Sequence, residues 1–320
     1  MSEYPTAGQN AFDSADFQAF EAASNDKALT AAVLGRLLEA VIATGSVLTG
    51  KQPLDFYVPG IGDGLQTSDY ARQLHESTSR RLRVWSDEPS APLAGQARAR
   101  LAALCFIDTV EITVGDAFAP TAFAAPRVDL AELSHMLYYV PEAAKISSLV
   151  ATIAQRLAPD GLAIFIHDTP GTNFTELLTR YSSLVLPDPV TAVAEAGAAL
   201  SLPLYRLDFT PRVRFEDPGV LDDLRYRRPE TAASTRTAQV VACLCQCSLA
   251  ELRRKGLFDQ ALMDVRDRLD DDGHLAIPST IQLMPAPELA ADARARRPLQ
   301  DAVAKTASHV PRLEQRFASL

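Results

Sequence analysis

The sequence of 320 residues predicts an α/β protein with helices on both faces of one mostly parallel sheet. Two observations favour this fold. Short apolar runs alternate with amphipathic segments through the first half of the chain. In addition, Gly60, Gly62 and Gly64 follow the first run, and Asp87 and Glu88 end the next. This is the order of a nucleotide-binding βαβ unit, because glycines let the backbone approach a nucleoside and a carboxylate can bind both ribose hydroxyls.

The apolar periodicity places the elements of this half. We expect helices at 26–42, 67–80 and 91–104, and strands at 54–58, 81–85, 110–114, 128–133 and 162–166. A further helix has Pro141 in its first turn and ends at the segment 159–161, Pro-Asp-Gly. Right-handed crossovers would then bring the ligand site to the carboxyl ends of the strands.

The alternation stops after residue 183. The segment 202–215 reads as a strand broken by Pro211, which favours an edge position. The region before the last strand is largely helical and polar, which suggests a cap over the substrate. The expected organisation is an N-terminal helical cap (1–53), a nucleotide-binding core (54–215), a helical insertion (216–272), the last core strand (273–284) and a C-terminal helical tail (285–320).

Charge and composition exclude several classes of partner. A net charge of −9 with a pI near 5.1 provides no basic field for a nucleic-acid backbone. The sequence has no apolar run of membrane-spanning length and does not begin with a signal-peptide pattern. We therefore expect a cytoplasmic protein, a monomer or homodimer, that acts on a small molecule and binds neither nucleic acid nor membrane.

Cysteine and histidine positions leave a metal site open but do not favour one. Cys243, Cys245 and Cys247 fall in a predicted helix over 237–255, where they are expected to be buried as small apolar side chains. The residues His135, His167 and Asp168 could pair or begin a metal site, but no carboxylate-rich cluster accompanies them. We expect no metal.

Motifs that the sequence lacks exclude two classes of nucleotide-binding protein. Short-chain dehydrogenases need a Tyr-x-x-x-Lys pair, and the residues four positions after Tyr138 and Tyr139 are Glu142 and Ala143. A P-loop is excluded because no Gly-Lys-Ser/Thr follows the glycines. The remaining candidate is S-adenosylmethionine. Asp116 would then lie near the adenine amino group, although a helix cap or turn role explains it equally well.

Three stretches resemble the histamine N-methyltransferase family. They are the glycine loop, the Glu-Pro-Ser at 88–90, and the segment 128–142 with its Met-Leu-Tyr-Tyr-Val run. The similarity covers 17–183 well and 202–284 loosely. It implies the Rossmann-like fold of class I methyltransferases, with a seven-stranded, mostly parallel sheet, and S-adenosylmethionine as cofactor. With the glycine loop and Asp116, the cofactor site would comprise Gly60, Gly62, Gly64, Glu88, Asp116, Ser134 and His135.

The resemblance also implies acceptor residues. The family's N-terminal glutamate falls on or near Glu21, and its two pocket tryptophans become Phe174 and Leu178. An asparagine on the last strand becomes Ser279, and a glutamine becomes His135. Because these positions have diverged, we expect the preferred substrate to be an amine other than histamine.

A mechanism follows for methyl transfer to such an amine. The nitrogen must be neutral when it attacks, so Glu21 or His135 would accept its proton, and Tyr139 would stack on the acceptor. Two alternatives stay open. One is an O-methyltransferase of natural-product biosynthesis, and the other is a binding protein that has the methyltransferase fold without turnover.

Overall fold

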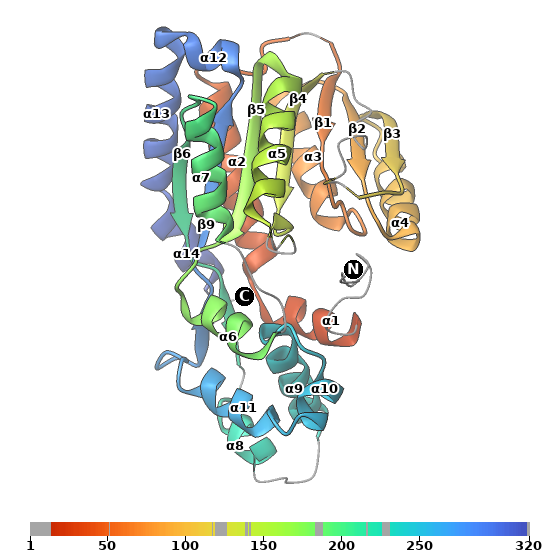
Figure 1. Cartoon of the computed structure of the whole chain (residues 1–320), viewed down its shortest axis with the longest axis vertical. Coiled ribbons are helices and arrows are strands. Elements are labelled where there is room, and N and C mark those ends of the chain that lie inside the picture. The colour runs from red at the N-terminus through yellow and green to blue at the C-terminus, as the bar shows by residue number, and fades with distance from the viewer. Residues whose placement is uncertain are drawn as a thin grey trace.

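The computed structural model describes residues 14–50, 52–116, 118, 127–137, 140, 142–182, 188–215, 217–225 and 231–318. A seven-stranded sheet forms the larger lobe (Figure 1), in the order β3-β2-β1-β4-β5-β9-β6. Its strands are β1 (Leu54–Tyr57), β2 (Leu82–Asp87), β3 (Ile107–Thr113), β4 (Val128–Ser134), β5 (Leu157–Asp168), β6 (Tyr205–Phe209) and β9 (Ser279–Pro285). In this sheet β9 pairs antiparallel with both β5 and β6, and the other neighbouring strands pair in parallel. The predicted Rossmann-like fold class is confirmed by this order and by the reversed β9.

Helices cover both faces of the sheet. Figure 1 shows α5 (Ala143–Arg156) and α7 (Pro189–Ala199) on the near face and α2 (Asp26–Ile42) on the far face. The helices α3 (Leu65–Thr78), α13 (Ala293–Ala307) and α14 (Val310–Phe317) pack against α2. The remaining helices of this lobe are α4 (Ala91–Ala102), which packs on β3, and α12 (Pro287–Ala291).

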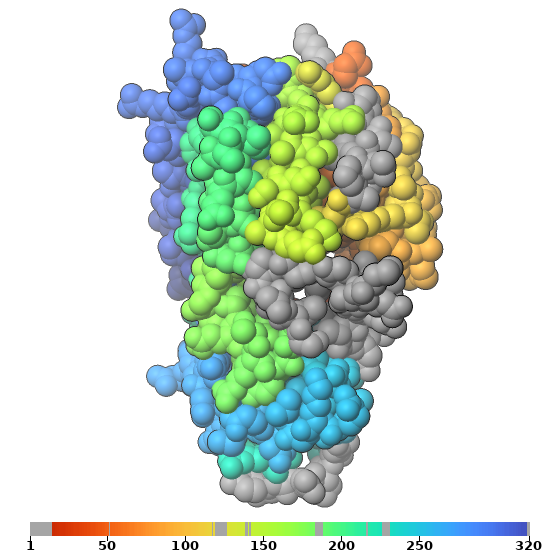
Figure 2. Space-filling model, in the orientation of Figure 1, coloured from red at the N-terminus to blue at the C-terminus, as the bar shows by residue number. Residues whose placement is uncertain are grey.

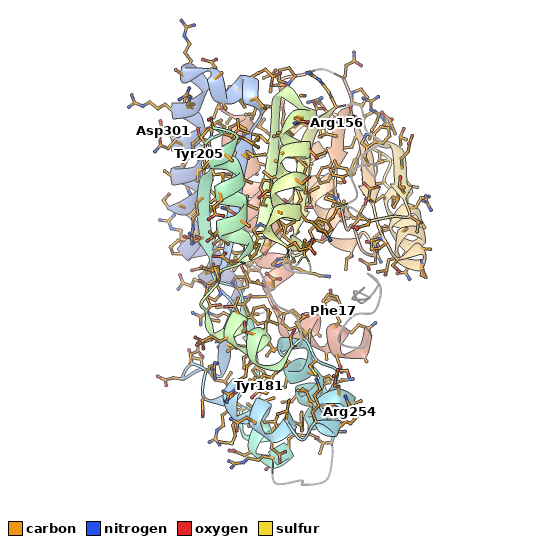
Figure 3. The ribbon with its side chains drawn as sticks, viewed as in Figure 1. Phe17, Arg156, Tyr181, Tyr205, Arg254 and Asp301 are labelled. Carbon is orange, nitrogen blue, oxygen red and sulfur yellow. The ribbon has the colours of Figure 1, made fainter. Side chains whose placement is uncertain are left out.

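A smaller lobe lies beyond the carboxyl ends of the parallel strands (Figures 1 and 2). It has its own apolar core. Its elements are α1 (Ser14–Ala23), α6 (Asn173–Tyr181), α8 (Gly219–Arg225), α9 (Ala232–Leu244), α10 (Leu249–Arg254), α11 (Phe258–Arg266) and the paired strands β7 (Arg212–Arg214) and β8 (His274–Ala276). Figure 3 shows Tyr181 in this lobe. Its hydroxyl donates to Asp264 over 2.5 Å, and Arg180 pairs with the same carboxylate at 2.7 Å.

The lobes differ from the expected division. Leu29 and Leu37 of α2 are fully buried in the core of the sheet lobe, so α2 is no cap. Conversely, α1 and α6 contribute to the smaller lobe. The predicted break at Pro211 is confirmed, because β6 ends at Phe209, β7 begins at Arg212, and β6 lies at the sheet edge.

Two local predictions are wrong. The helix expected over 237–255 ends at Leu244, where Gln246 takes a left-handed φ of 47° and the Cys247 N–H bonds to the Ala242 carbonyl at 3.2 Å. All three cysteines there are nevertheless buried, and burial raises the pKa of each thiol. Residues 159–161 were expected to lie between a helix and a later strand. In the structure β5 begins at Leu157 and includes them, and its pairing with β4 shifts register there.

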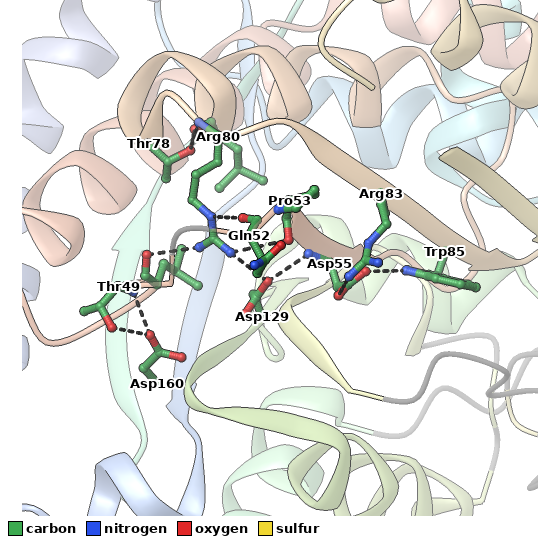
Figure 4. A network of polar contacts seen from close by, with 12 residues as sticks. Thr49, Gln52, Pro53, Asp55, Thr78, Arg80, Arg83, Trp85, Asp129 and Asp160 are labelled. Atoms are coloured by element: carbon green, nitrogen blue, oxygen red, sulfur yellow. Dashed lines mark hydrogen bonds and ion pairs between the residues drawn. The ribbon is translucent and has the colours of Figure 1, made fainter. Parts of the chain in front are cut away.

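A buried guanidinium ties together the amino ends of the strands (Figure 4). Arg80 donates to the carbonyl of Gln52 at 2.8 Å and to that of Leu48 at 3.1 Å. It also contacts Asp129 at 3.2 Å, whose carboxylate accepts the Asp55 N–H at 2.8 Å. Every bond joins segments that are distant in sequence, so the network fixes how the loop before β1 meets β4.

Arg80→Ala is expected to lower the free energy of unfolding by about 3 kcal/mol, the lower end for a broken buried ion pair, because Asp129 keeps one backbone partner. Arg72→Ala is the matched control, since Arg72 is exposed and pairs with Asp69 one helical turn away; it should cost less than about 0.5 kcal/mol. Urea unfolding of both variants measures the difference. Equal losses would show that the buried network contributes no more than a surface pair.

None of the helices in the described residues combines a bilayer-spanning length with an apolar composition.

Candidate functional site

The glycine loop turns at the carboxyl end of β1 through three left-handed residues. Gly60, Gly62 and Gly64 have φ values of 65°, 59° and 76°. A Cβ on Gly64 would lie 2.9 Å from the Cα of Ala97, so close packing of α3 on α4 requires glycine there. Among the described residues, no atom would lie within 4 Å of a Cβ on Gly62. The loop therefore presents bare backbone at Gly62 while Gly64 anchors the following helix.

Glu88 holds this loop from the end of β2. Its Oε2 accepts the Gly62 N–H at 2.9 Å, and its Oε1 accepts the Ser90 N–H at 2.9 Å. The side chain is buried, with 4% exposed. Each carboxylate oxygen can accept a second hydrogen bond, so one acceptor position per oxygen remains for a ligand.

Asp87 and Asp116 have more local roles in the structure. The Tyr57 hydroxyl donates to Asp87 at 2.9 Å, and burial, with the charge of Asp116 as a lesser cause, raises the pKa of Asp87 to about 6. Asp116 is exposed and accepts the N–H of Phe118 at 2.9 Å, as a turn residue does. The turn role that the sequence left open is thus observed, and an adenine contact by Asp116 stays a prediction.

A histidine between two carboxylates lies at the ends of β4 and β5. His135 directly follows Ser134, the last residue of β4, and has a left-handed φ of 50°. Its Nε2 lies 3.8 Å from Asp26 Oδ2, and its Nδ1 lies 3.7 Å from Asp168 Oδ1. Thr30 donates to the other Asp26 oxygen at 3.1 Å. A backbone in the left-handed region thus directs the imidazole between α2 and β5, with a carboxylate facing each ring nitrogen.

Ser279 joins this group from β9. It pairs with Asp168 in the antiparallel register, and its hydroxyl donates to Asp168 over 3.5 Å. Burial raises the pKa of Asp168 to about 6, while the neighbouring His135 opposes the rise. The carboxyl group is therefore ionised at neutral pH but not far from its titration.

The neighbouring His167 is a different kind of residue. It is fully buried, and burial lowers its pKa to about 3, so the ring is neutral. Within the described residues its nitrogens have no hydrogen-bond partner. The same part of the chain contains no group of three or more His, Cys, Asp or Glu side chains arranged to hold a metal ion. Metal independence itself stays a prediction.

The expected acceptor residues are distributed between the lobes. Glu21 lies on α1 and pairs with Lys27 at the start of α2. Phe174 and Leu178 are buried in the apolar core of the smaller lobe. Tyr139 lies outside the described residues. The roles of these four residues stay predictions. Ser134 and His135, however, lie at the carboxyl end of β4, and Ser279 begins the antiparallel β9 at the same edge of the sheet.

Sequence reasoning missed Asp26. Its only local signal is its position as an acidic residue in the first turn of a helix, which is common for electrostatic reasons alone. Its contact with His135 depends on how α2 packs across the end of the sheet, and no short-range pattern shows that.

Comparisons with known proteins assign no family to this chain. No protein-family model matches the sequence, and no curated protein matches it either. Among solved structures, the YcgJ protein from Bacillus subtilis is 15% identical, with a TM-score of 0.47 over 78% of this chain and 98% of that one. The N-methyltransferase NodS from Bradyrhizobium japonicum, in complex with S-adenosyl-L-homocysteine, is 12% identical, with a TM-score of 0.45 over 89% and 98%. Likenesses of this size identify no substrate.

Proposed function

We propose that this chain is an S-adenosylmethionine-dependent methyltransferase that methylates an amine nitrogen of a small molecule. The observation that carries the proposal is the bond between Glu88 and the Gly62 N–H. It places a buried acid and bare glycine backbone beside each other at the carboxyl ends of β2 and β1. In an open parallel sheet, ligands bind at this edge, next to the point where the strand order reverses, here between β1 and β4.

The residues present fit the cofactor. The open position at Gly62 leaves room for the methionyl-adenosyl chain against backbone, and Glu88 retains one acceptor position on each oxygen for the two ribose hydroxyls. Met136, whose side chain would lie 3.7 Å from a Cβ on Gly60, closes the gap between the loop and β4. When bound, the cofactor supplies an electrophilic methyl group on a sulfonium.

The chain's own residues then prepare the acceptor. His135 accepts the proton that the amine must lose before its lone pair attacks. Asp26 and Asp168 stabilise the imidazolium that results, each less than 4 Å from a ring nitrogen. A site with carboxylates on both sides of its base also favours a cationic amine over a neutral or anionic acceptor. Holding nitrogen and methyl carbon in line supplies most of the remaining rate enhancement.

The acceptor is proposed to be an amine other than histamine. In the family that the sequence resembles, two tryptophans line the acceptor pocket, and Phe174 and Leu178 stand at those positions. Both are packed into the core of the smaller lobe. Loss of an aromatic face at these positions would weaken binding of an aromatic acceptor by about 0.5–1.5 kcal/mol of stacking energy.

The proposal is tested first by ligand-dependent stability. S-adenosylhomocysteine at 100 times its dissociation constant should stabilise the fold by about 2.7 kcal/mol, whereas NAD at the same concentration should leave it unchanged. Thermal unfolding monitors both, and radiolabelled methyl transfer to a panel of amines and phenols identifies the acceptor class. Stabilisation by NAD but not by S-adenosylhomocysteine would refute the cofactor, and turnover confined to phenols would refute the amine.

A further inference from the structure

Asp26 reaches His135 from a junction between the lobes. Only Ser24 and Asn25 separate α1, in the smaller lobe, from α2, in the sheet lobe. At this point the chain pairs with β7. Ser24 forms a bridge with Val213, and the Asn25 N–H donates to the Arg212 carbonyl at 3.1 Å. The position of Asp26, the next residue, is therefore set by whatever holds this junction.

The Asn25 side chain holds three segments together. An asparagine directly before a helix usually caps it, but this one makes no capping bond. Instead its Oδ1 accepts the Arg212 N–H at 2.7 Å, and its Nδ2 donates to the Phe317 carbonyl of α14 at 2.8 Å. The side chain is buried, with 7% exposed. Its amide thus donates to a residue 292 positions away in the sequence and accepts from one 187 positions away.

The C-terminal helix makes a second contact at the same place. Glu314 of α14 accepts the N–H of Thr210 through Oε1 at 2.6 Å. Thr210 lies in the break between β6 and β7, just before Pro211. Because α14 also packs on α2 and β6, it connects two of the places where the chain passes between the lobes, α1 to α2 and β6 to β7, to the face that carries α2.

We infer that Asn25 and Glu314 are positioning residues that hold Asp26 against His135, so that the C-terminal helix forms part of the acceptor-binding machinery. The effect on acceptor binding rests on the proposed function, whereas the shielding of His135 by Asp26 does not. Loosening either contact lets the start of α2 shift while β4 and β5 stay in place. The glycine loop and Glu88 lie on other strands, so cofactor binding should be indifferent to the change.

The geometric part is tested by labelling His135 with diethyl pyrocarbonate and mapping the modified peptide by mass spectrometry. Asp26→Ala removes the carboxylate beside Nε2 and should speed labelling several-fold. Asn25→Asp, which keeps the acceptor but loses the donor to Phe317, and Glu314→Ala should produce a similar rise. Glu314→Gln retains an acceptor for the Thr210 N–H and should label at the wild-type rate. So should Asp301→Ala, an exposed change on the outer side of α13 (Figure 3). Wild-type labelling in either Asn25→Asp or Glu314→Ala overturns the inference.

The functional part is tested on the amine found by the acceptor panel. Asn25→Asp and Glu314→Ala should raise its KM about tenfold, equivalent to about 1.4 kcal/mol, with S-adenosylhomocysteine affinity unchanged and KM restored in Glu314→Gln. A fall in kcat alone, or an equal loss of cofactor affinity, indicates general destabilisation and overturns the positioning role. If S-adenosylhomocysteine binds no form of the protein, the proposed function fails, while the labelling result still shows whether Asn25 and Glu314 hold Asp26 against His135.

Discussion

Glu88→Ala should weaken S-adenosylhomocysteine binding at least about 100-fold, the largest loss expected from any single change at the cofactor site. The substitution removes two charge-assisted hydrogen bonds to the ribose, each worth about 1.5–3 kcal/mol. It also releases the Gly62 N–H, which Glu88 now accepts at 2.9 Å, so the glycine loop loses its support from β2. Isothermal titration with S-adenosylhomocysteine measures the change.

The neighbouring acid provides the matched control. Asp87 is equally buried, but its partner is the Tyr57 hydroxyl rather than the loop. Asp87→Asn should therefore leave the affinity within a few-fold of wild type, whereas Glu88→Gln, which keeps one carbonyl oxygen, should fall between wild type and Glu88→Ala. A large loss in Asp87→Asn with none in Glu88→Ala would mean that the acids at the end of β2 have exchanged roles.

The fold was predictable where local pattern and topology agree. The expected helix over 26–42 coincides with α2, and the glycine loop, β2 and its terminal acids fall within a few residues of their expected places. These signals are short-range, because a strand, a tight turn and a helix follow one another within 35 residues. The proposed cofactor residues Gly62 and Glu88 were predictable for the same reason, because each follows closely after a predicted strand.

Predictions failed where tertiary contacts override a local pattern. The apolar run through Cys243 and Cys247 has helical periodicity throughout, yet the helix ends where Gln246 turns left-handed. No glycine or proline marks that turn. The acceptor half of the site is non-local for the same reason. Asp26, His135 and Ser279 come together only because α2 and β9 pack at the ends of β4 and β5, so no local pattern in the sequence indicated Asp26.

Burial of Glu132 is expected to make the stability of the fold depend strongly on pH. Glu132 lies on β4 with 2% of its surface exposed, and its charge faces the buried Tyr70 of α3. Its Oε1 has no hydrogen-bond partner within the described residues. Burial accordingly raises the pKa of Glu132 to about 8. The native protein therefore holds a proton that the unfolded chain releases near its ordinary pKa of about 4.5.

The sign of the stability change follows from linkage. A carboxyl group whose pKa is raised on folding gives stability that is fully present below about pH 4.5 and is lost as the pH rises to about 8, by at most about 5 kcal/mol. Glu132→Gln keeps the shape but has no proton to lose. It should match the wild type near pH 5 and exceed its stability by several kcal/mol near pH 9, measured by urea unfolding. Glu288→Gln, at an exposed position on α12, should change neither value. A difference that is the same at both pH values would show that the Glu132 carboxylate is stabilised by solvent or a partner when it ionises.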